Sequence, residues 1–429
     1  MYKQRKLLKK LIELKDNDKI IIIVGPRQSG KTTLLKLLKN QLEKSGYRTQ
    51  MLDLDIFSNY EKIATYENIV NYLKLNGYRE EGKEKYILLL DEFQRYQDIT
   101  RVLKNLHDHH RNIKIYATGS SSLTVKNSIQ ESLSGRKLIY KLYPLDFEEF
   151  LNFKEDYELL NILTKVDSLE GKNLSAIISP LLSSLEEFII FGGYPEVVLT
   201  EGRENKREIL RSIFDLYVKK ELVEYLNLQK IYPAKTLIEY LAINNGQKIN
   251  YDNIASVSGI SHKTVKNYIG ILEETFLIKK LPPFFTNKKL EIVKSPKIYF
   301  IDPGVVNYFI RNFEALKLRK DAGFLFETYI LSEILKMGIE PDSLKHWEDK
   351  NKREVDIIID HPKYLEAIEI KFKSSIKADD FRGINAFSRM YNEKYKLSLF
   401  LINTVMQYQK TGISVRLPFN LEFLRVHSK

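Results

Sequence analysis

The sequence predicts an α/β fold, in which a parallel sheet with a phosphate-binding loop is followed by a helical lid, a winged helix-turn-helix and a second α/β domain. Three observations predict this order. Short β-branched runs alternate with helical segments through residues 20–142. A glycine-rich loop with a lysine follows the first run, and two β-rich runs near the carboxyl end carry ordered acidic residues. The expected domains cover residues 1–143, 144–230, 231–317 and 318–429.

The composition is that of an ordinary globular chain, with 429 residues, 43% hydrophobic and 29% charged. The absence of cysteine excludes disulfides, cysteine zinc sites and a catalytic thiol, and it agrees with a reducing cytoplasm. The apolar runs are short, and the lysine-rich start lacks the apolar core of a signal peptide. We therefore expect a cytoplasmic protein with no membrane-spanning helix.

The net charge of +12 favours association with a polyanion such as DNA. The alternative is a compositional bias, because abundant lysine, glutamate and isoleucine are also found in thermophiles and in AT-rich genomes. Charge alone leaves both interpretations open.

The first strand, residues 20–24, leads into a sequence that fits G-x-x-x-x-G-K-[ST] at every fixed position. Backbone N–H groups of such a loop enclose phosphate oxygens, Lys31 reaches the outer phosphates, and the Thr32 hydroxyl is placed to ligate Mg²⁺. A chance glycine-rich turn is the alternative. The residues expected to bind ATP are Gly25, Pro26, Arg27, Gln28, Ser29, Gly30, Lys31, Thr32, Thr33, Asp91 and Ser120.

The elements around this loop follow from periodicity. Residues 3–15 show a helical apolar stripe, which we expect to pack beside the first strand, and residues 33–44 continue as a helix. Residues 47–54 and 86–90 are predicted strands, and the second ends in Asp91 and Glu92. Asp91 would hold Mg²⁺, and Glu92 would orient or deprotonate the water that attacks the γ-phosphate.

Two further strands are predicted at residues 113–118 and 137–142. Thr118 and Ser120 are candidates for contact with the γ-phosphate or the lytic water, and a plain turn is the alternative. Arg136 is a candidate arginine finger or sensor, although it also fits a surface arginine that caps a strand. No guanine-reading N-K-x-D motif is present, which favours ATP.

From residue 144 the pattern becomes helical, with a break at residues 192–195. Residues 233–244, 250–257 and 261–274 then read as three helices, with Gly259 at the turn and Ser261 as a cap. The third helix would expose a polar and basic face suited to a major groove, formed by His262, Lys263, Lys266 and Asn267. A module that packs against protein instead of DNA is the alternative.

The last domain carries acidic residues in the order that a metal-dependent nuclease uses. Asp356 opens one predicted strand, Glu369 and Lys371 share a face of the next, and Glu327 lies on the preceding helix. Asp356 and Glu369 would hold Mg²⁺, and Lys371 would position a water for phosphodiester attack. A solvated charged surface is the alternative.

The chain resembles predicted ATPases of archaea and bacteria that belong to the AAA+ superfamily. The resemblance runs through GPRQSGKTTLL, LLLDEFQ, ATGSSSL, LSGRKLIYKLYPLDFEEFL, FGGYPEVV, KSPKIYFIDPGVVNY, FLFETYI, REVDIII and AIEIK. It implies a P-loop NTPase parallel sheet of the AAA+ type, with the strand at residue 113 between those at residues 20 and 86. It also implies a winged helix and a restriction-endonuclease-like domain with a PD-(D/E)xK core, of unknown role.

Our first hypothesis is a DNA-associated ATPase with a nuclease-like carboxyl-terminal domain. The alternative is a nucleotide-dependent switch that regulates a protein partner without nuclease activity. A helicase-like translocase is a weaker third interpretation, because the sequence shows no further motor motifs. A homo-oligomer is compatible with each of them.

Overall fold

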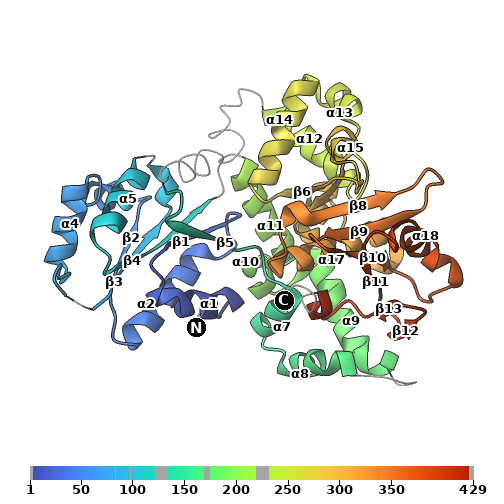
Figure 1. The fold of residues 1–429 in the computed structure, drawn as a ribbon, viewed down its shortest axis with the longest axis horizontal. Helices are drawn as coiled ribbons and strands as arrows, with labels where there is room; N and C mark the ends of the chain where they lie inside the picture. Colours follow the sequence, from blue (N-terminus) through green and yellow to red (C-terminus); the bar gives the residue numbers. More distant parts are fainter. Residues whose placement is uncertain are drawn as a thin grey trace. The chain divides into compact units, whose positions relative to one another are not determined.

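The computed structural model describes residues 3–82, 84–96, 98–120, 133–168, 174–218 and 231–424. These residues form two compact units (Figure 1). The first unit contains the described residues up to Pro144 and the short segment Glu274–Phe276. The second unit contains the remaining described residues.

The first unit is built on a five-stranded parallel sheet of order β2-β3-β4-β1-β5. Its strands are β1 (Ile20–Gly25), β2 (Arg48–Asp53), β3 (Tyr86–Asp91), β4 (Ile113–Ser120) and β5 (Lys137–Lys141). All residues of β1, β3 and β4 are buried, as expected for central parallel strands covered on both faces. The α/β class and the position of β4 between β1 and β3 are confirmed.

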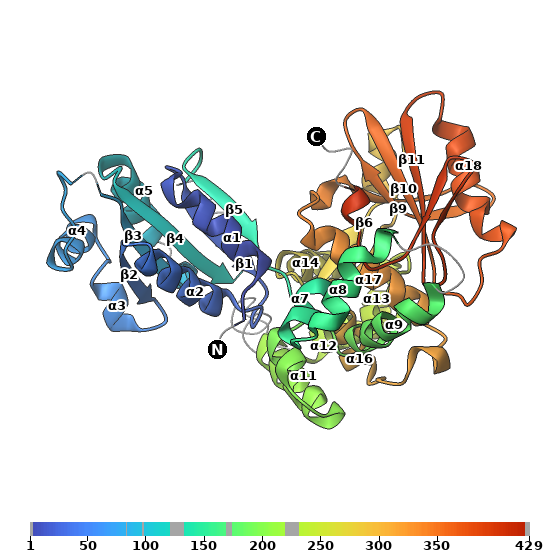
Figure 2. The same cartoon turned by 90° about the horizontal axis from the view of Figure 1, so that it is seen from below.

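Helices cover this sheet on its faces. They are α1 (Lys6–Glu13), α2 (Lys31–Lys44), α3 (Phe57–Glu61), α4 (Tyr66–Leu75) and α5 (Ile99–His109). The apolar stripes of α1 and α2 share one hydrophobic cluster with alternate residues of β1, β3 and β4, and Figure 2 shows these two helices side by side on the sheet. The expected packing of the first helix beside the first strand is therefore confirmed.

The second unit begins with helices that the sequence had suggested as a lid on the nucleotide-binding sheet. They are α7 (Phe147–Phe153), α8 (Tyr157–Lys165), α9 (Leu174–Phe191), α10 (Pro195–Leu199) and α11 (Arg203–Tyr217). Phe147 and Phe188 pack on Tyr329, and the Phe147 N–H donates to Glu333. Tyr329 and Glu333 both lie in α17 (Ala322–Lys336). These helices belong to the core of the second unit, and the four proposed domain boundaries stay predictions.

Among the described helices, α9 is the one long and apolar enough to cross a membrane by length and composition. Eight of its residues are buried in the second unit. Its Glu187 lies beside Lys154 and Lys206 at 2.9 and 3.4 Å. These contacts are those of a core helix.

Two glycine-containing motifs, FGGYP and IDPG, pack against each other in the second unit. Gly192 has φ +80°, and a Cβ at this position would lie 2.0 Å from an oxygen of Asp302. Asp302 accepts hydrogen bonds from the N–H groups of Gly193 at 2.7 Å and Gly304 at 2.9 Å, and thereby caps α16 (Pro303–Ile310). The FGGYP and IDPG motifs therefore fix the backbone, since only glycine fits this approach.

Three helices follow, α12 (Ile231–Ile243), α13 (Tyr251–Ser258) and α14 (His262–Glu274), at the positions expected from the sequence. Gly259 ends α13 with φ +67°, and the Ser261 hydroxyl accepts the Thr264 N–H at 3.1 Å. A two-stranded antiparallel sheet comes next, formed by β6 (Ile278–Leu281) and β7 (Lys297–Phe300). Helix α15 (Lys288–Val293) lies between the two strands in the chain.

The carboxyl-terminal region is a six-stranded mixed sheet of order β12-β13-β11-β10-β9-β8. Its strands are β8 (Leu344–Glu348), β9 (Glu354–Asp360), β10 (Tyr364–Lys371), β11 (Lys396–Asn403), β12 (Tyr408–Lys410) and β13 (Ile413–Arg416). Helix α18 (Arg382–Tyr391) packs its Phe387 and Tyr391 on the cluster around Trp347. The predicted strands that carry Asp356 and Glu369 are thus confirmed as neighbours, β9 and β10.

Candidate functional site

The phosphate-binding loop connects the carboxyl end of β1 to the start of α2. Gln28 and Gly30 have positive φ angles of 59° and 94°, which turn the chain tightly before the first helical turn. A Cβ on Gly25 would lie 2.1 Å from the Leu142 carbonyl oxygen, so the loop entrance admits only glycine. The backbone N–H groups at the start of α2 make this place suitable for an anion.

Two side chains of the loop indicate that it fits a phosphate group. Lys31 is 5% exposed, and its ammonium donates to the carbonyls of Gly25 at 3.0 Å and Pro26 at 2.8 Å. The buried Ser29 hydroxyl has no hydrogen-bond partner within the described part of the chain. A polar group buried without a partner is uncommon, and a phosphate oxygen would supply one.

Arg5 supports the loop from α1, and sequence reasoning missed it. Its guanidinium is buried and donates to the Ser29 carbonyl at 2.8 Å and to the Tyr143 carbonyl at 2.9 Å. It therefore ties the loop to the end of the segment that follows β5. In the sequence Arg5 is one of many basic residues near the start, so no local pattern singled it out.

The acidic pair lies at the carboxyl end of β3, beside the end of β4. The Thr118 hydroxyl donates to Asp91, which is 2% exposed. Glu92 adopts a left-handed conformation with φ 53°, and its carboxylate accepts a hydrogen bond from Gln94. Gln94 also donates to the Ser120 hydroxyl at 3.0 Å, so it connects the candidate base to the candidate sensor.

Sequence reasoning did not identify Gln94, although its position two residues after Glu92 was a signal. Thr118 and Ser120 do lie beside the acidic pair as expected, while residues 121–132 fall outside the described residues. Thr32, in the first turn of α2, and Asp91 are the residues that would hold Mg²⁺ with a bound nucleotide. Their roles remain predictions.

The position of Arg136 fits the alternative of a surface arginine that caps a strand, and a role as arginine finger stays a prediction. Arg136 precedes β5, which runs parallel to β1, and its carbonyl accepts the N–H of Ile20 at the start of β1 at 2.8 Å. It therefore lies at the amino edge of the sheet, whereas the phosphate-binding loop leaves the opposite edge, a strand length of roughly 16 Å away. The guanidinium binds Asp108 in a bidentate ion pair, at 2.6 and 3.0 Å, and this pairing lowers the pKa of Asp108 to about 2.

A second group of charged residues lies between β7, α17, β9 and β10 in the second unit. Strand β9 carries one extra residue opposite β8, between Val355 and Ile358, and Asp356 lies in this bulge. The paired β9–β10 ladder ends at Ile357 and Ile368. The Asp356 carboxylate then accepts the Ile370 N–H at 2.7 Å.

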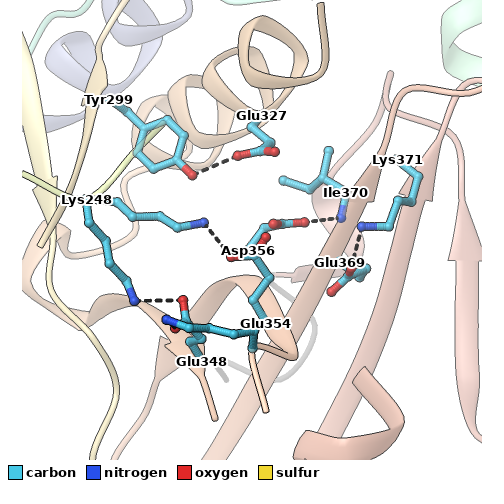
Figure 3. Close-up of polar contacts among 11 residues, drawn as sticks. Lys248, Tyr299, Glu327, Glu348, Glu354, Asp356, Glu369, Ile370 and Lys371 are labelled. Atoms are coloured by element: carbon cyan, nitrogen blue, oxygen red, sulfur yellow. Dashed lines mark hydrogen bonds and ion pairs between the residues drawn. The ribbon is translucent and has the colours of Figure 1, made fainter. Parts of the chain in front are cut away.

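The other acidic residues of this group are also paired. Figure 3 shows Glu327 hydrogen-bonded to the Tyr299 hydroxyl, at 2.8 Å, on one side of Asp356, and Lys371 bonded to Glu369 on the other. The structure thus brings together Glu327, Asp356, Glu369 and Lys371, in an interior that is largely buried and not on a solvated surface.

Burial dominates the ionisation of this group. Burial, and next the charge of Asp356, raise the pKa of Glu327 to about 8 and that of Glu369 well above its usual range. Burial alone would lower the pKa of Lys371, but Asp356 and Glu369 outweigh it and raise the pKa. Two lysines, Lys371 and Lys297, thus oppose the negative charge.

The expectation of a divalent cation here is not supported by the donor arrangement. Over the ranges that the structure describes, no three carboxylate or imidazole side chains converge in a way that could hold a metal ion. Asp356 and Glu369 as Mg²⁺ ligands, and Lys371 as the residue that positions water, therefore stay predictions.

The basic face expected on α14 is exposed. His262, Lys263, Lys266 and Asn267 lie on the surface, while Val265 and Ile269 are buried. His262 stacks on Tyr251 of α13, with ring centroids 5.4 Å apart, and the Lys266 ammonium lies 5.4 Å from the same ring. The face is therefore partly ordered by the preceding helix.

Comparison with known families divides the chain into three parts. Residues 17–151 match the model of an AAA domain, and residues 182–316 and 322–420 match two domains of unknown function. Together with the parallel sheet, the first match identifies an AAA-type P-loop domain with the fold of nucleotide-binding ATPases. The loop, Asp91 and Glu92 all fall within it.

The relatives among curated proteins are uncharacterised. One, from Methanocaldococcus jannaschii, is 29% identical over 83% of this chain and 76% of its own length, and one from Haemophilus influenzae is 26% identical over 87% of each. A Walker-type ATPase of Pyrococcus abyssi is a distant structural likeness, with 14% identity, a TM-score of 0.46, and coverage of 72% of this chain and 96% of that one. The ORC2 protein of Aeropyrum pernix in its ADP form is 13% identical, with a TM-score of 0.33. This likeness covers 65% of this chain and 87% of that one.

Proposed function

We propose that the first unit of this protein binds ATP with Mg²⁺ and hydrolyses it. The observation that carries the proposal is the convergence of three groups at the carboxyl edge of one parallel sheet. Lys31 follows β1, Asp91 and Glu92 follow β3, and Thr118 and Ser120 end β4. Ligands of open parallel sheets bind at this edge, where the helix N-terminus also points.

Each group has a role that its contacts support. Lys31 and the N–H groups of the loop would bind the outer phosphates, in exchange for the carbonyls that Lys31 now contacts. Asp91, oriented by Thr118, would hold the cation through its carboxylate. Glu92 would orient the attacking water, with Gln94 keeping its carboxylate directed toward Ser120.

The test measures phosphate release and the binding of a fluorescent ATP analogue by the full chain. Wild-type protein should turn over ATP, and Lys31→Ala should lose both binding and turnover. Lys36→Ala, an exposed lysine on the same helix, is the matched control and should retain both. Failure of wild-type protein to bind ATP at any Mg²⁺ concentration would refute the proposal.

DNA association is a second candidate function, favoured by the exposed basic face of α14. Helices α13 and α14, the turn at Gly259 and the β6–β7 sheet follow the order of a winged helix. Duplex binding, measured by fluorescence anisotropy at several salt concentrations, should weaken in Lys263→Glu/Lys266→Glu and with rising salt. Lys235→Glu, an exposed change on α12, should leave the affinity unchanged.

The alternative of a nucleotide-dependent switch makes the carboxyl-terminal region a docking surface for a protein partner. Incubating plasmid with the protein and Mg²⁺ or Mn²⁺ distinguishes this switch from a nuclease. Cleavage that Asp356→Ala and Lys371→Ala abolish would favour nuclease chemistry. Absence of cleavage together with absence of salt-dependent DNA binding would favour the switch.

A further inference from the structure

The β6–β7 sheet and the carboxyl-terminal sheet meet in a junction within the second unit. The Phe284 N–H donates to the His346 carbonyl at 2.6 Å, and the His346 N–H donates to the Pro282 carbonyl at 2.9 Å, so the main chain leaving β6 pairs with β8. On the other side, Lys248 pairs with β7 through its main chain, and its ammonium binds Glu348 of β8 at 2.7 Å. Backbone and side chains therefore fasten the two sheets together.

Lys297, the first residue of β7, is the central cation of this junction. Its side chain is 7% exposed, and its ammonium lies 3.2 Å from Glu354 of β9. Burial alone would lower the pKa of Lys297, but the negative charges of Glu327, Asp356 and Glu354 outweigh it and raise the pKa. The ammonium thus pairs with Glu354 and lies close enough to Glu327 and Asp356 for their charges to act on it. Tyr299, two residues further along β7, binds Glu327.

We propose that the Lys297 ammonium is the resident cation of this acidic group, and that the group fastens the β6–β7 sheet to the carboxyl-terminal sheet without a divalent metal. Each acidic residue already has at least one partner in the chain, and one Glu369 oxygen accepts no hydrogen bond within the described residues. Glu327 accepts from Tyr299, Asp356 from the Ile370 N–H, and Glu369 from Lys371. A buried lysine with a positive charge repels a divalent cation from the same carboxylates.

The geometry around Glu369 adds a second reason. A Cβ on Gly383, in the first turn of α18, would lie 1.9 Å from the Glu354 carbonyl oxygen and 3.2 Å from a Glu369 carboxylate oxygen. The start of α18 therefore packs directly over Glu369 and Glu354.

The test measures Mn²⁺ bound to the full chain by electron paramagnetic resonance without nucleotide, so that the phosphate loop has no phosphate to share a metal with. The expected result is that wild-type protein and Asp356→Asn give the same binding curve. Lys297→Met replaces the ammonium with a neutral side chain of similar length. It should gain a Mn²⁺ site at least about tenfold tighter than any in wild-type protein, and Asp356→Asn in that background should remove the site.

Thermal unfolding in EDTA provides the second measurement. Lys297→Met should unfold at a temperature several degrees lower, because it leaves buried carboxylates without a cation, and Mn²⁺ should restore part of the loss. Lys289→Met, an exposed change on α15, is the control and should behave as wild-type protein.

A Mn²⁺ ion that wild-type protein binds and Asp356→Asn loses would overturn the proposal, and this comparison stands even if Lys297→Met does not fold. Mg²⁺-dependent plasmid cleavage that Asp356→Asn abolishes would also overturn it. So would a Lys297→Met protein with no new Mn²⁺ site and a wild-type unfolding temperature in EDTA.

Discussion

The phosphate-binding loop and the acidic group around Asp356 are both built from charged residues at strand ends, yet they differ in how the charges are paired. In the loop, the Lys31 ammonium donates to main-chain carbonyls, and the buried Ser29 hydroxyl has no hydrogen-bond partner within the described residues. In the acidic group, Lys297 and Lys371 stand against the carboxylates. The first arrangement leaves a buried hydroxyl for a ligand to bind, and the second supplies the opposite charge from the chain.

The order of acidic residues and a lysine along strands is therefore not enough to indicate a metal site. What matters is whether a cation of the protein itself already occupies the space between the carboxylates. If the comparison is right, changes in the loop should reduce activity and leave stability almost unchanged. Changes in the acidic group should do the reverse.

The largest effect is expected from Glu92→Gln. Replacing the carboxylate removes the group that orients the attacking water, so the rate of ATP hydrolysis should fall roughly 10²–10⁴-fold. ATP binding and the unfolding temperature should stay near wild-type values, as measured by analogue fluorescence and calorimetry. A variant that hydrolyses ATP normally would assign the role to another residue.

Glu366 should show the cost of a buried carboxyl that accepts no hydrogen bond within the described residues. Both of its oxygens lack hydrogen-bond partners within the described residues, and burial raises its pKa to about 8. Below the unfolded pKa of about 4.3 both states are protonated. As pH rises from there to about 8, only the unfolded state ionises, so stability falls.

Glu366→Leu should therefore raise the free energy of unfolding at pH 8, by on the order of 2–4 kcal/mol, and have a much smaller effect at pH 5. Urea unfolding at the two pH values measures the difference. Glu393→Leu, at an exposed position, should show no such pH dependence. An equal effect of Glu366→Leu at both pH values would contradict the raised pKa of Glu366. If the effect changed mainly near pH 6, His361, which lies 3.5 Å from Glu366, would be implicated.

Tyr299→Phe tests the junction of the second unit with the removal of one oxygen. Glu327 would lose its hydrogen-bond donor in a buried place, so the free energy of unfolding should fall by about 1–3 kcal/mol. The rate of ATP hydrolysis should change little. Tyr232→Phe, at an exposed tyrosine of α12, is the control for the measurement, which is urea unfolding followed by circular dichroism.

Arg5→Lys tests the support of the phosphate-binding loop. Lysine keeps the charge but cannot bind the Ser29 and Tyr143 carbonyls at once, because it lacks the planar fork of arginine. The loss of one such hydrogen bond, about 1–1.5 kcal/mol, should raise the KM for ATP roughly tenfold, with a smaller change in kcat. An unchanged KM would show that the loop is held without Arg5.

Arg136→Ala should have the smallest effect. Its guanidinium lies at the amino edge of the sheet and pairs with Asp108, so kcat should stay within about twofold in dilute protein. Repeating the assay at rising protein concentration tests whether Arg136 acts between copies of the chain. A defect that appears only at high concentration would indicate that Arg136 acts on a neighbouring copy.

Much of the first unit was predictable because its signals are local. The fixed spacing from Gly25 to Thr32 and the buried runs before Asp91 and Thr118 are properties of consecutive residues, and parallel strands bring their carboxyl ends to one edge. Arg5 and Gln94 were missed because their partners depend on side-chain reach. The two interpretations of Arg136 could not be separated, because proximity in sequence to a strand does not say which edge of the sheet the arginine faces.

Spacing and periodicity were enough to predict the α/β class, the phosphate-binding loop, the acidic pair and the five strands of the first sheet. How the charges near Asp356 are neutralised depends on contacts between distant segments. Lys297 and Asp356 are separated by 59 positions in the chain, and nothing in the pattern of either segment specifies their encounter. Electrostatic pairing acts through space, so the same acidic motif indicates a metal site or an internal ion pair according to what the fold brings beside it.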